Sequence, residues 1–250
     1  MAINAMSGKG RIEVFEDFIA NELPVAGTAA AGNLGPFRVV GQGIAESDSG
    51  AVALETDGLS GVIQLTTTDE DAHSLCLVTA KMFDVAKMGP IVAEARVRLS
   101  DLDTKQVFFG FTDENDDDQI IEGEIMKGAT TTLTLTASDI CGFYLSDELT
   151  DDEDWHGAYN GGTTTGETVS TSVDLDADAV AGEWQILRLE VDPNGTARWY
   201  VDENLKQTVE GAVSTTTDLA LVIGVHSNTT ECQTLDIDYI AFSAGRDWNA

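Results

Sequence analysis

The chain has few of the features that mark a helical or membrane-spanning protein. Its 250 residues include only 4 prolines and 7% aromatic residues. Its apolar stretches are short and rich in β-branched residues, which is typical of strands. No run of about 18 apolar residues exists, so the sequence predicts no membrane-spanning helix. Residues 1–11 lack an apolar core of signal-peptide length, and we therefore expect no secretory targeting.

Basic residues are also scarce. Thirteen lysines and arginines stand against 44 aspartates and glutamates, which gives a formal net charge of −31. A surface this acidic repels nucleic acid and anionic lipid, so we expect neither as a partner. The charge fits high solubility, and it leaves open a divalent cation or a basic partner.

Cysteine is nearly absent as well. The three cysteines, Cys76, Cys141 and Cys232, are odd in number and show no CxxC spacing, which argues against a disulfide framework and a zinc site. Cys76 and Cys141 lie in apolar, strand-like segments and are predicted to be buried thiols. This usage indicates a reducing compartment or an assembly made in one.

What the sequence does contain is a pattern of short strands, clearest in residues 183–202. Leu187, Leu189 and Val191 alternate with charged residues, the period of a half-buried strand. A second alternating segment follows an Asp-Pro-Asn-Gly sequence, which favours a tight turn. We therefore predict a hairpin with a fixed register, and we expect its tryptophans, Trp184 and Trp199, to anchor the core.

Further strands are expected at the spacing of about 8 to 12 residues that is typical of a β-sandwich. Residues 91–99 alternate between apolar and charged positions, and residues 219–225 are apolar on both faces, as in the middle of a packed sheet. In residues 107–112, Gly110 predicts a bulge or a close backbone approach. The closing strand, residues 235–242, is predicted to point Leu235, Ile237 and Tyr239 to one side.

No linker or internal repeat divides these strands. We therefore expect one domain over residues 12–250, preceded by a flexible arm at residues 1–11. The arm carries Lys9 and Arg11, a cationic tip on a very acidic molecule. Either the terminus is simply frayed, or these two residues bind an acidic or grooved partner surface.

Five segments suggest a family when taken in order: EDF at 16–18, EARV at 94–97, FFGFTD at 108–113, the hairpin at 184–202 and DIDYI at 236–240. Their order resembles the concanavalin A-like jelly roll of lectin-type and glucanase-type domains. The resemblance implies an all-β sandwich of antiparallel sheets. It also implies that the first and last strands pair near one edge of the same sheet.

A narrower resemblance bears on function. EARVRLS at 94–100, FFGFTD at 108–113, GFYLSD at 142–147 and the hairpin at 184–202 are together similar to virion proteins of tailed bacteriophages. Those proteins coat or decorate the capsid. The resemblance implies a non-enzymatic structural protein, made in the host cytoplasm and placed on the capsid exterior. Its partners would be the major capsid protein and further copies of itself, and many copies would cement the junctions between capsid subunits.

An acidic loop offers the candidate metal site. Asp113, Asn115, Asp117 and Glu124 stand at positions 1, 3, 5 and 12 of an EF-hand-like loop, the pattern that binds Ca²⁺. Asp118 replaces the glycine of position 6, and a strand rather than a helix precedes the loop. The sequence therefore leaves two interpretations, a calcium site or a solvated acidic turn.

A second acidic segment supports an alternative function. Trp155 and Tyr159 lie among carboxylates in residues 151–160, and exposed aromatic rings beside carboxylates are typical of glycan-binding sites. They are the candidate glycan contacts of a lectin-like host-adhesion module. The competing interpretation is that both rings are buried in the sandwich, as large aromatic side chains usually are.

A hydrolase is the least supported function. Jelly-roll glucanases place their carboxylates on one strand as Glu-x-Asp-x-x-Glu, and no such sequence occurs here. Glu122 and Glu124 supply only two members. The histidines, His73, His156 and His226, fit no serine or cysteine nucleophile pattern. We therefore predict no catalytic residues.

Overall fold

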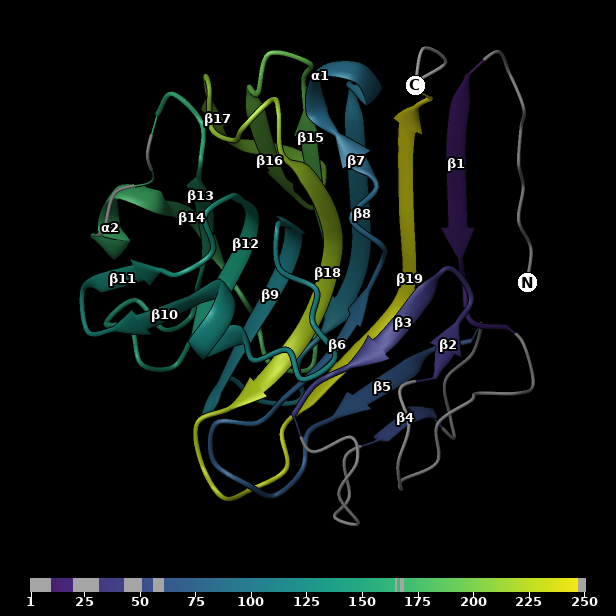
Figure 1. Cartoon of the computed structure of the whole chain (residues 1–250). Coiled ribbons are helices and arrows are strands. Elements are labelled where there is room, and N and C mark those ends of the chain that lie inside the picture. The colour runs from purple at the N-terminus through teal and green to yellow at the C-terminus, as the bar shows by residue number, and fades with distance from the viewer. Residues whose placement is uncertain are drawn as a thin grey trace.

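The strands form two antiparallel sheets that face each other across one apolar core (Figure 1). The computed structural model describes residues 10–19, 32–42, 51–55, 61–164, 166 and 169–246. Within these residues, helices are limited to three short segments: α1 (Val85–Met88), the π-helix η1 (Ile121–Ile125) and α2 (Ser170–Val173). The predicted all-β sandwich is confirmed.

One sheet has eight strands: β1 (Arg11–Glu16), β4 (Ala51–Leu54), β5 (Ile63–Thr66), β8 (Ile91–Arg98), β15 (Trp184–Val191), β16 (Ala197–Val201), β17 (Asn204–Val209) and β19 (Thr234–Gly245). Their order is β17-β16-β15-β8-β19-β5-β4, and β1 pairs with the C-terminal half of β19. Figure 1 shows β1 lying alongside β19. The predicted pairing of the first and last strands is therefore confirmed.

The other sheet has nine strands: β2 (Asn33–Leu34), β3 (Phe37–Val40), β6 (Ser74–Val78), β7 (Phe83–Asp84), β9 (Lys105–Thr112), β12 (Ile140–Ser146), β13 (Asp154–Asn160), β14 (Asp174–Asp178) and β18 (Asp218–Ser227). Their order is β14-β13-β12-β9-β18-β6-β3-β2, and β7 pairs with β18. A separate two-stranded sheet joins β10 (Met126–Ala129) to β11 (Thr132–Leu135).

The hairpin predicted at residues 183–202 forms as β15 and β16. Leu187 lies opposite Val201, and Val191 lies opposite Ala197. The Asp192 amide donates to the carbonyl of Thr196 at 2.8 Å, which closes the turn. The inward side chains of β15 and β8 are buried as predicted. Their alternation sends charged residues to the opposite side of the sheet, and this placement determines the candidate site described below.

The predicted close approach at Gly110 is also confirmed. A Cβ atom built there would lie under 3.0 Å from the Cα atom of Gly142 and the carbonyl oxygen of Cys141 in the paired strand β12. Trp199 is buried as predicted and donates from Nε1 to the Gly142 carbonyl at 2.9 Å. The two sheets are therefore joined across the core at this point.

Two aromatic residues lie on the opposite face from the one predicted. The pairing of β19 with β8 shifts register between Ile237 and Tyr239, so that Tyr239 points away from the core and Ile240 points into it. A β-bulge of this kind reverses the alternation beyond it. Trp184 is opposite Arg98, on the outward side of β15, and is only partly buried.

Cys76 and Cys141 are buried and free, as predicted, and burial raises the pKa of both thiols. Arg11, which we counted with the flexible arm, instead begins β1 opposite Gly245. Lys9 and the rest of residues 1–9 lie outside the described residues. Among the described residues, no helix is long and apolar enough to cross a bilayer.

Candidate functional site

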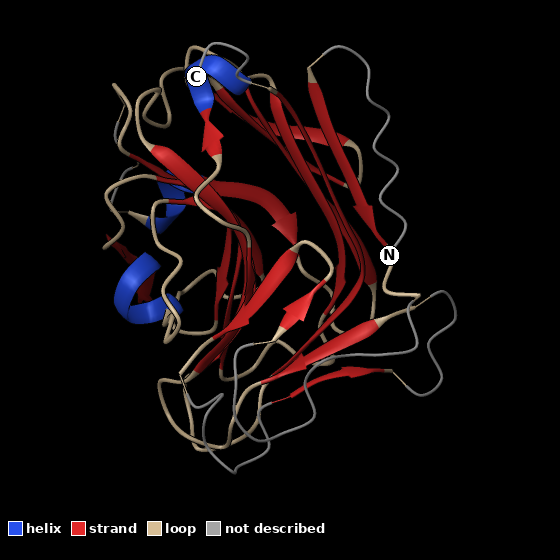
Figure 2. Ribbon diagram, turned by 45° about the vertical axis from the view of Figure 1, so that its right-hand side comes forward, coloured by secondary structure: helices blue, strands red, loops and turns tan. Residues whose placement is uncertain are grey.

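The outer face of the nine-stranded sheet is covered by the chain's own residues 113–139, which connect β9 to β12. Ile121 and Ile125 of η1 are fully buried, and the Ile121 amide donates to Ser74 Oγ of β6 at 2.9 Å. The Gly128 amide of β10 donates to the hydroxyl of Tyr144 in β12 at 2.8 Å. In Figure 2 the short helices, in blue, lie outside the red strands. This segment therefore covers the sheet over β9, β12 and β18, while a hollow of about 830 Å³ stays open beside β3 and the end of β6, lined by Arg38, Val78 and the acidic loop.

Beneath this cover, the structure brings together a serine, a histidine and a glutamate that the sequence pattern did not connect. Ser74 Oγ lies 2.8 Å from His226 Nδ1, and His226 Nε2 lies 3.0 Å from Glu122 Oε2. The order of contacts is that of a nucleophile, a base and an orienting carboxylate. Ser74 and His226 are 152 positions apart in the sequence, so no local pattern could connect them.

The burial of this trio argues for a structural role. Ser74 is 1% exposed and His226 is 0% exposed. Ser74 Oγ also accepts the Ile121 amide, so one of its lone pairs is occupied. Burial holds the pKa of His226 below its usual range, although Glu122 opposes this. The three side chains fasten η1 to the sheet, and a substrate has no access to the hydroxyl.

This interpretation predicts that a fluorophosphonate serine probe leaves the folded protein unlabelled. Replacing Ser74 with alanine is expected to lower the free energy of unfolding by about 1–3 kcal/mol, because the Ile121 amide and His226 lose a buried partner. Mass spectrometry after probe treatment, together with urea unfolding, checks both results. Stoichiometric labelling of Ser74 in the folded protein would instead identify a nucleophile.

The four residues of the predicted calcium loop do not converge on one point. They contact four separate partners: Asp113 accepts the Asp139 amide at 3.0 Å, Asn115 donates to the Thr79 carbonyl at 3.2 Å, Asp117 pairs with Arg38, and Glu124 accepts the Ile120 amide at 3.0 Å. The described part of the chain contains no group of three or more His, Cys, Asp or Glu that could hold a metal ion. The calcium site stays a prediction for which the structure provides no assembled ligand set.

The two predicted glycan contacts are buried. Trp155 is 0% exposed, and its Nε1 donates to Gln185 Oε1 at 3.0 Å. Tyr159 packs against Trp199 in the core, with ring centroids 6.0 Å apart. Neither ring can stack on a sugar. The prediction that Trp155 and Tyr159 line a binding surface is therefore wrong for this structure, because both follow the inward alternation of β13.

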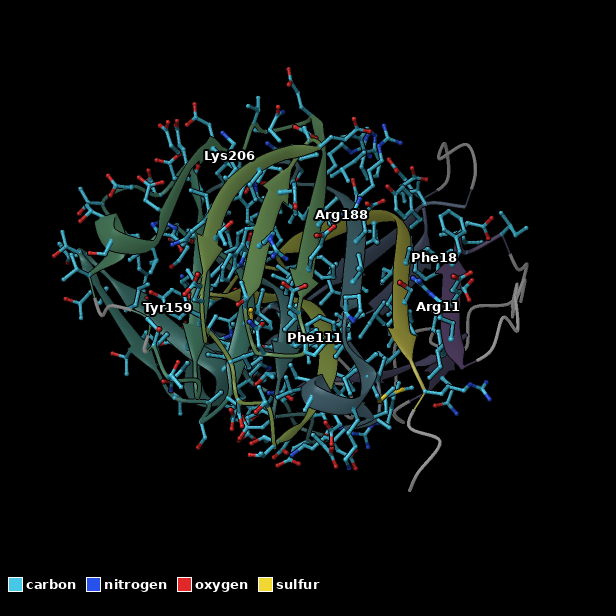
Figure 3. All side chains as sticks on the ribbon, turned by 90° about the horizontal axis from the view of Figure 1, so that it is seen from above. Arg11, Phe18, Phe111, Tyr159, Arg188 and Lys206 are labelled. Carbon is cyan, nitrogen blue, oxygen red and sulfur yellow. The ribbon has the colours of Figure 1, made fainter. Side chains whose placement is uncertain are left out.

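The outer face of the eight-stranded sheet remains uncovered by any other described segment, and it concentrates the scarce arginines. Five of the seven arginines in the sequence lie on it, together with four aromatic residues. We call this set the arginine–aromatic face: Arg11, Phe15, Arg96, Arg98, Trp184, Arg188, Arg198, Tyr200 and Tyr239. Figure 3 labels Arg11 and Arg188, which reach this face from β1 and β15.

Each of the five arginines is held by a carboxylate. The pairs are Arg11 with Glu13 at 3.1 Å, Arg96 with Asp238 at 2.6 Å, Arg98 with Asp236 and Glu55 at 2.7 Å each, Arg198 with Asp192 at 2.7 Å, and Arg188 with Glu190. The hydrogen bonds that Arg98 donates to Asp236 raise the pKa of Arg98. Networks of this kind fix the planes of the guanidinium groups and so pre-organise the face.

Aromatic rings also contact three of these arginines. The guanidinium carbons of Arg96 and Arg98 lie 4.8 and 4.7 Å from the ring centroid of Trp184, and that of Arg188 lies 5.6 Å from the ring of Tyr200. These are cation–π distances. Phe15 is 47% exposed and stacks on Tyr239, with ring centroids 5.2 Å apart.

Two adjacent hollows open on this face and share Glu94 and Arg188. The first, about 430 Å³, lies over β1 and β19 beside Phe15. The second, about 440 Å³, is lined by Glu94, Ile186, Arg188, Glu190, Tyr200, Glu203 and Tyr239, and we call it the Tyr200–Tyr239 hollow. The Tyr239 hydroxyl donates to Glu94 Oε1 at 2.8 Å, and burial together with this carboxylate raises the pKa of Tyr239.

Sequence reasoning found part of this face and missed the rest. The outward positions of Glu94, Arg96 and Arg98 were predicted from alternation, and the structure confirms them. Tyr239 and Trp184 were assigned to the interior. The signal for Trp184 was present, because it has the same parity as Arg188 on β15. No pattern in the sequence predicts the position of the β-bulge that turns Tyr239 outward.

Similarity to known proteins is confined to solved structures, since no protein-family model and no curated protein matches the sequence. A protein of unknown function from Shewanella oneidensis MR-1 is 12% identical, with 97% of this chain and 90% of that chain covered and a TM-score of 0.61. The Bacillus licheniformis β-glucanase is 14% identical over 92% and 97%, with a TM-score of 0.53. The potassium-bound carbohydrate recognition domain of Emp46p is 12% identical over 83% and 88%, with a TM-score of 0.51. These likenesses concern the fold, and the chain has the concanavalin A-like jelly-roll fold.

Proposed function

We propose that the chain is a non-catalytic binding protein that decorates the outside of a tailed-phage capsid and docks through the arginine–aromatic face. The observation that carries this proposal is the composition of that face. Arginine, tyrosine, tryptophan and phenylalanine are the residues enriched where protein interfaces gain most of their binding energy. Their concentration on one open sheet of a molecule with a net charge of −31 favours a protein partner.

The side chains of the face are already held in place, and this supports docking. The guanidinium groups are fixed by carboxylates and aromatic rings before any partner arrives, so binding immobilises few side chains. That lowers the entropic cost of association. The similarity of residues 94–100, 108–113, 142–147 and 184–202 to virion proteins supports the capsid as the partner. Many copies on one shell would bind with avidity even where each contact is weak.

Two features support a non-catalytic role. The other sheet face is covered by residues 113–139, and Ser74, the hydroxyl that contacts a histidine, is buried. The glucanase-type carboxylate pattern is also missing from the sequence.

Mass spectrometry of virions purified from the source culture tests the proposal directly. We expect the protein at many copies per particle, and its absence from the particle would end the proposal.

The docking face is tested with a single charge reversal. Arg188→Glu is expected to weaken co-sedimentation with purified shells at least tenfold, because it repels Glu94 and Glu190 and disorders the face. Lys81→Glu, the same charge change at an exposed turn outside the face, serves as the matched control. Equal binding by both variants would show that docking uses another surface. Deleting residues 1–9 tests the cationic arm separately.

A second candidate function is a lectin-like module for host adhesion. The two adjoining hollows favour it, because aromatic side chains beside carboxylates are suited to sugar hydroxyls. A glycan array separates the candidates. Saturable sugar binding that disappears in Tyr239→Ala and survives in Lys81→Glu would support the lectin over the decoration protein.

A further inference from the structure

The Tyr200–Tyr239 hollow has an excess of negative charge. Three carboxylates line it, from Glu94, Glu190 and Glu203, and one guanidinium, from Arg188. Three negative charges against one positive charge leave a formal net charge of −2. Arg96 and Arg198 on the same face are paired with Asp238 and Asp192, so they do not offset these two charges. The electrostatics of the hollow therefore favour a cation.

The aromatic walls have the geometry that a cation requires. The faces of tyrosine rings attract guanidinium and ammonium groups within about 6 Å of the ring centroid. Arg188 already occupies such a position over Tyr200, at 5.6 Å. Tyr239 lines the same hollow, where its ring stacks on Phe15 and its hydroxyl donates to Glu94.

Glu203 reaches the hollow from a tight turn. Asp202 and Glu203 form the two-residue turn between β16 and β17, and both have positive φ, +48° and +66°. Asparagine and glycine are the residues such a turn prefers. Asp202 suits the turn because its Oδ1 accepts the Ile186 amide at 2.8 Å. Glu203 has no comparable backbone contact, and its side chain lines the hollow. Seven described non-glycine residues have positive φ, so the conformation alone assigns no role, and Glu203 matters here through the place of its side chain on the hollow.

We propose that the Tyr200–Tyr239 hollow binds one arginine or lysine side chain of the partner protein. The side chain lies between the two tyrosines, and its charge is met by Glu94 and Glu203. This inference rests on the proposed docking function and names the partner's chemistry: a basic residue exposed on the capsid surface. A neutral sugar in the same hollow is the competing occupant.

The test uses acetyl-Gly-Arg-Gly-amide as a probe, titrated into the full-length protein and followed by NMR. We expect saturable binding at millimolar concentration, with shifts at Tyr200, Tyr239 and Glu203, and at least threefold weaker binding in 0.5 M salt, which screens the charges over about 4 Å. Acetyl-Gly-Glu-Gly-amide is expected to cause no shifts. The absence of arginine-peptide binding, or equal binding by the glutamate peptide, would overturn the inference.

The variant Glu203→Gly separates a role in peptide binding from a role in stability. It is expected to raise the melting temperature, because glycine adopts positive φ without strain, and to weaken peptide binding at least threefold. Asp176→Gly is the matched control: Asp176 also has positive φ, at +50°, and it is exposed outside the hollow. It should raise the melting temperature and leave peptide binding unchanged. Unchanged peptide binding by Glu203→Gly would overturn the role of Glu203.

Further outcomes separate this inference from the docking proposal. If maltotriose shifts the same residues and the arginine peptide does not, the hollow is a sugar site and the inference fails. If Arg188→Glu loses shell binding while no peptide binds, docking through the face stands and the cation pocket fails. If the peptide binds while Glu203→Gly sediments with shells as the wild type does, the pocket exists and its use in docking fails.

Discussion

Gly110→Ala is expected to prevent folding or to lower the free energy of unfolding by about 3 kcal/mol, the upper part of the range for overpacked cores. A Cβ atom at residue 110 would lie under 3.0 Å from the Gly142 Cα atom and the Cys141 carbonyl oxygen. Both belong to the backbone of β12, so no side-chain rotation relieves the contact. β9 lies between β12 and β18, and moving it disturbs the hydrogen bonds on both sides.

Urea unfolding of soluble protein measures this effect, and recovery from the soluble fraction reports failure to fold. Gly123→Ala is the matched control, because a Cβ there meets only the Ile120 side chain, at an ordinary 3.7 Å. We expect the control to change stability by less than about 1 kcal/mol, the size of a glycine-to-alanine propensity difference. Equal stability of both variants would contradict the close approach of β9 and β12.

Asp154→Asn is expected to remove a loss of stability that the wild type suffers as pH rises towards neutrality. Asp154 of β13 lies directly opposite Asp178 of the edge strand β14. Burial, followed by the hydrogen bond with Asp178 and the charges of Asp174, Asp178 and Asp151, raises the pKa of Asp154 to about 7. Asp154 therefore keeps its proton in the folded protein well above the usual pKa range of aspartate.

The direction in which stability changes with pH follows from the number of protons bound by the folded and unfolded states. Between the ordinary aspartate pKa, near 4, and the raised value of about 7, the folded state holds a proton that the unfolded chain has released. Stability from this group is thus complete below about pH 4 and is lost as pH rises to about 7. A shift of about three units corresponds to about 4 kcal/mol, and partial solvent exposure reduces our expectation to about 2 kcal/mol.

The measurement is the free energy of unfolding at pH 5 and pH 8 for the wild type and for Asp154→Asn. The variant should gain relative to the wild type at pH 8, since asparagine has no proton to lose. Asp152→Asn, an exposed neighbour in the preceding turn, is the control and should keep the wild-type pH dependence. Burial lowers the pKa of His156 and His226, and their opposite effect below about pH 6.5 is common to all three proteins. Parallel pH profiles for the wild type and Asp154→Asn would contradict the raised pKa of Asp154.

The candidate site shows which features a local sequence pattern can predict and which it cannot. The arginines of β8 and β15 were predicted to face outward because period-two alternation is a property of a single strand. Whether that outward face stays open depends on which segment covers it. Residues 113–139 cover the outer face of the nine-stranded sheet through contacts such as Ile121 with Ser74, which are 47 positions apart in the chain. No pattern in either segment specifies that contact.

The aromatic residues show the same limit. Trp155 and Tyr159 are buried, whereas Trp184 lies on the outer face, where its parity with Arg188 on β15 places it. Trp155 was considered a candidate sugar contact because carboxylates surround it in the sequence. Those carboxylates lie in the preceding turn and the edge of the sheet, while the ring itself follows the inward face of β13 and packs on Phe143.

The sequence by itself determined the all-β class, the register of the β15–β16 hairpin and the inward face of β8. Each of these depends on alternation or turn chemistry within a few residues, where backbone sterics decide the outcome. Only the tertiary structure decided which sheet face stays open, that Tyr239 turns outward at a bulge, and that Glu122, Ser74 and His226 meet beneath η1. Those outcomes depend on long-range packing and on the burial of polar groups with partners, which no single segment can specify.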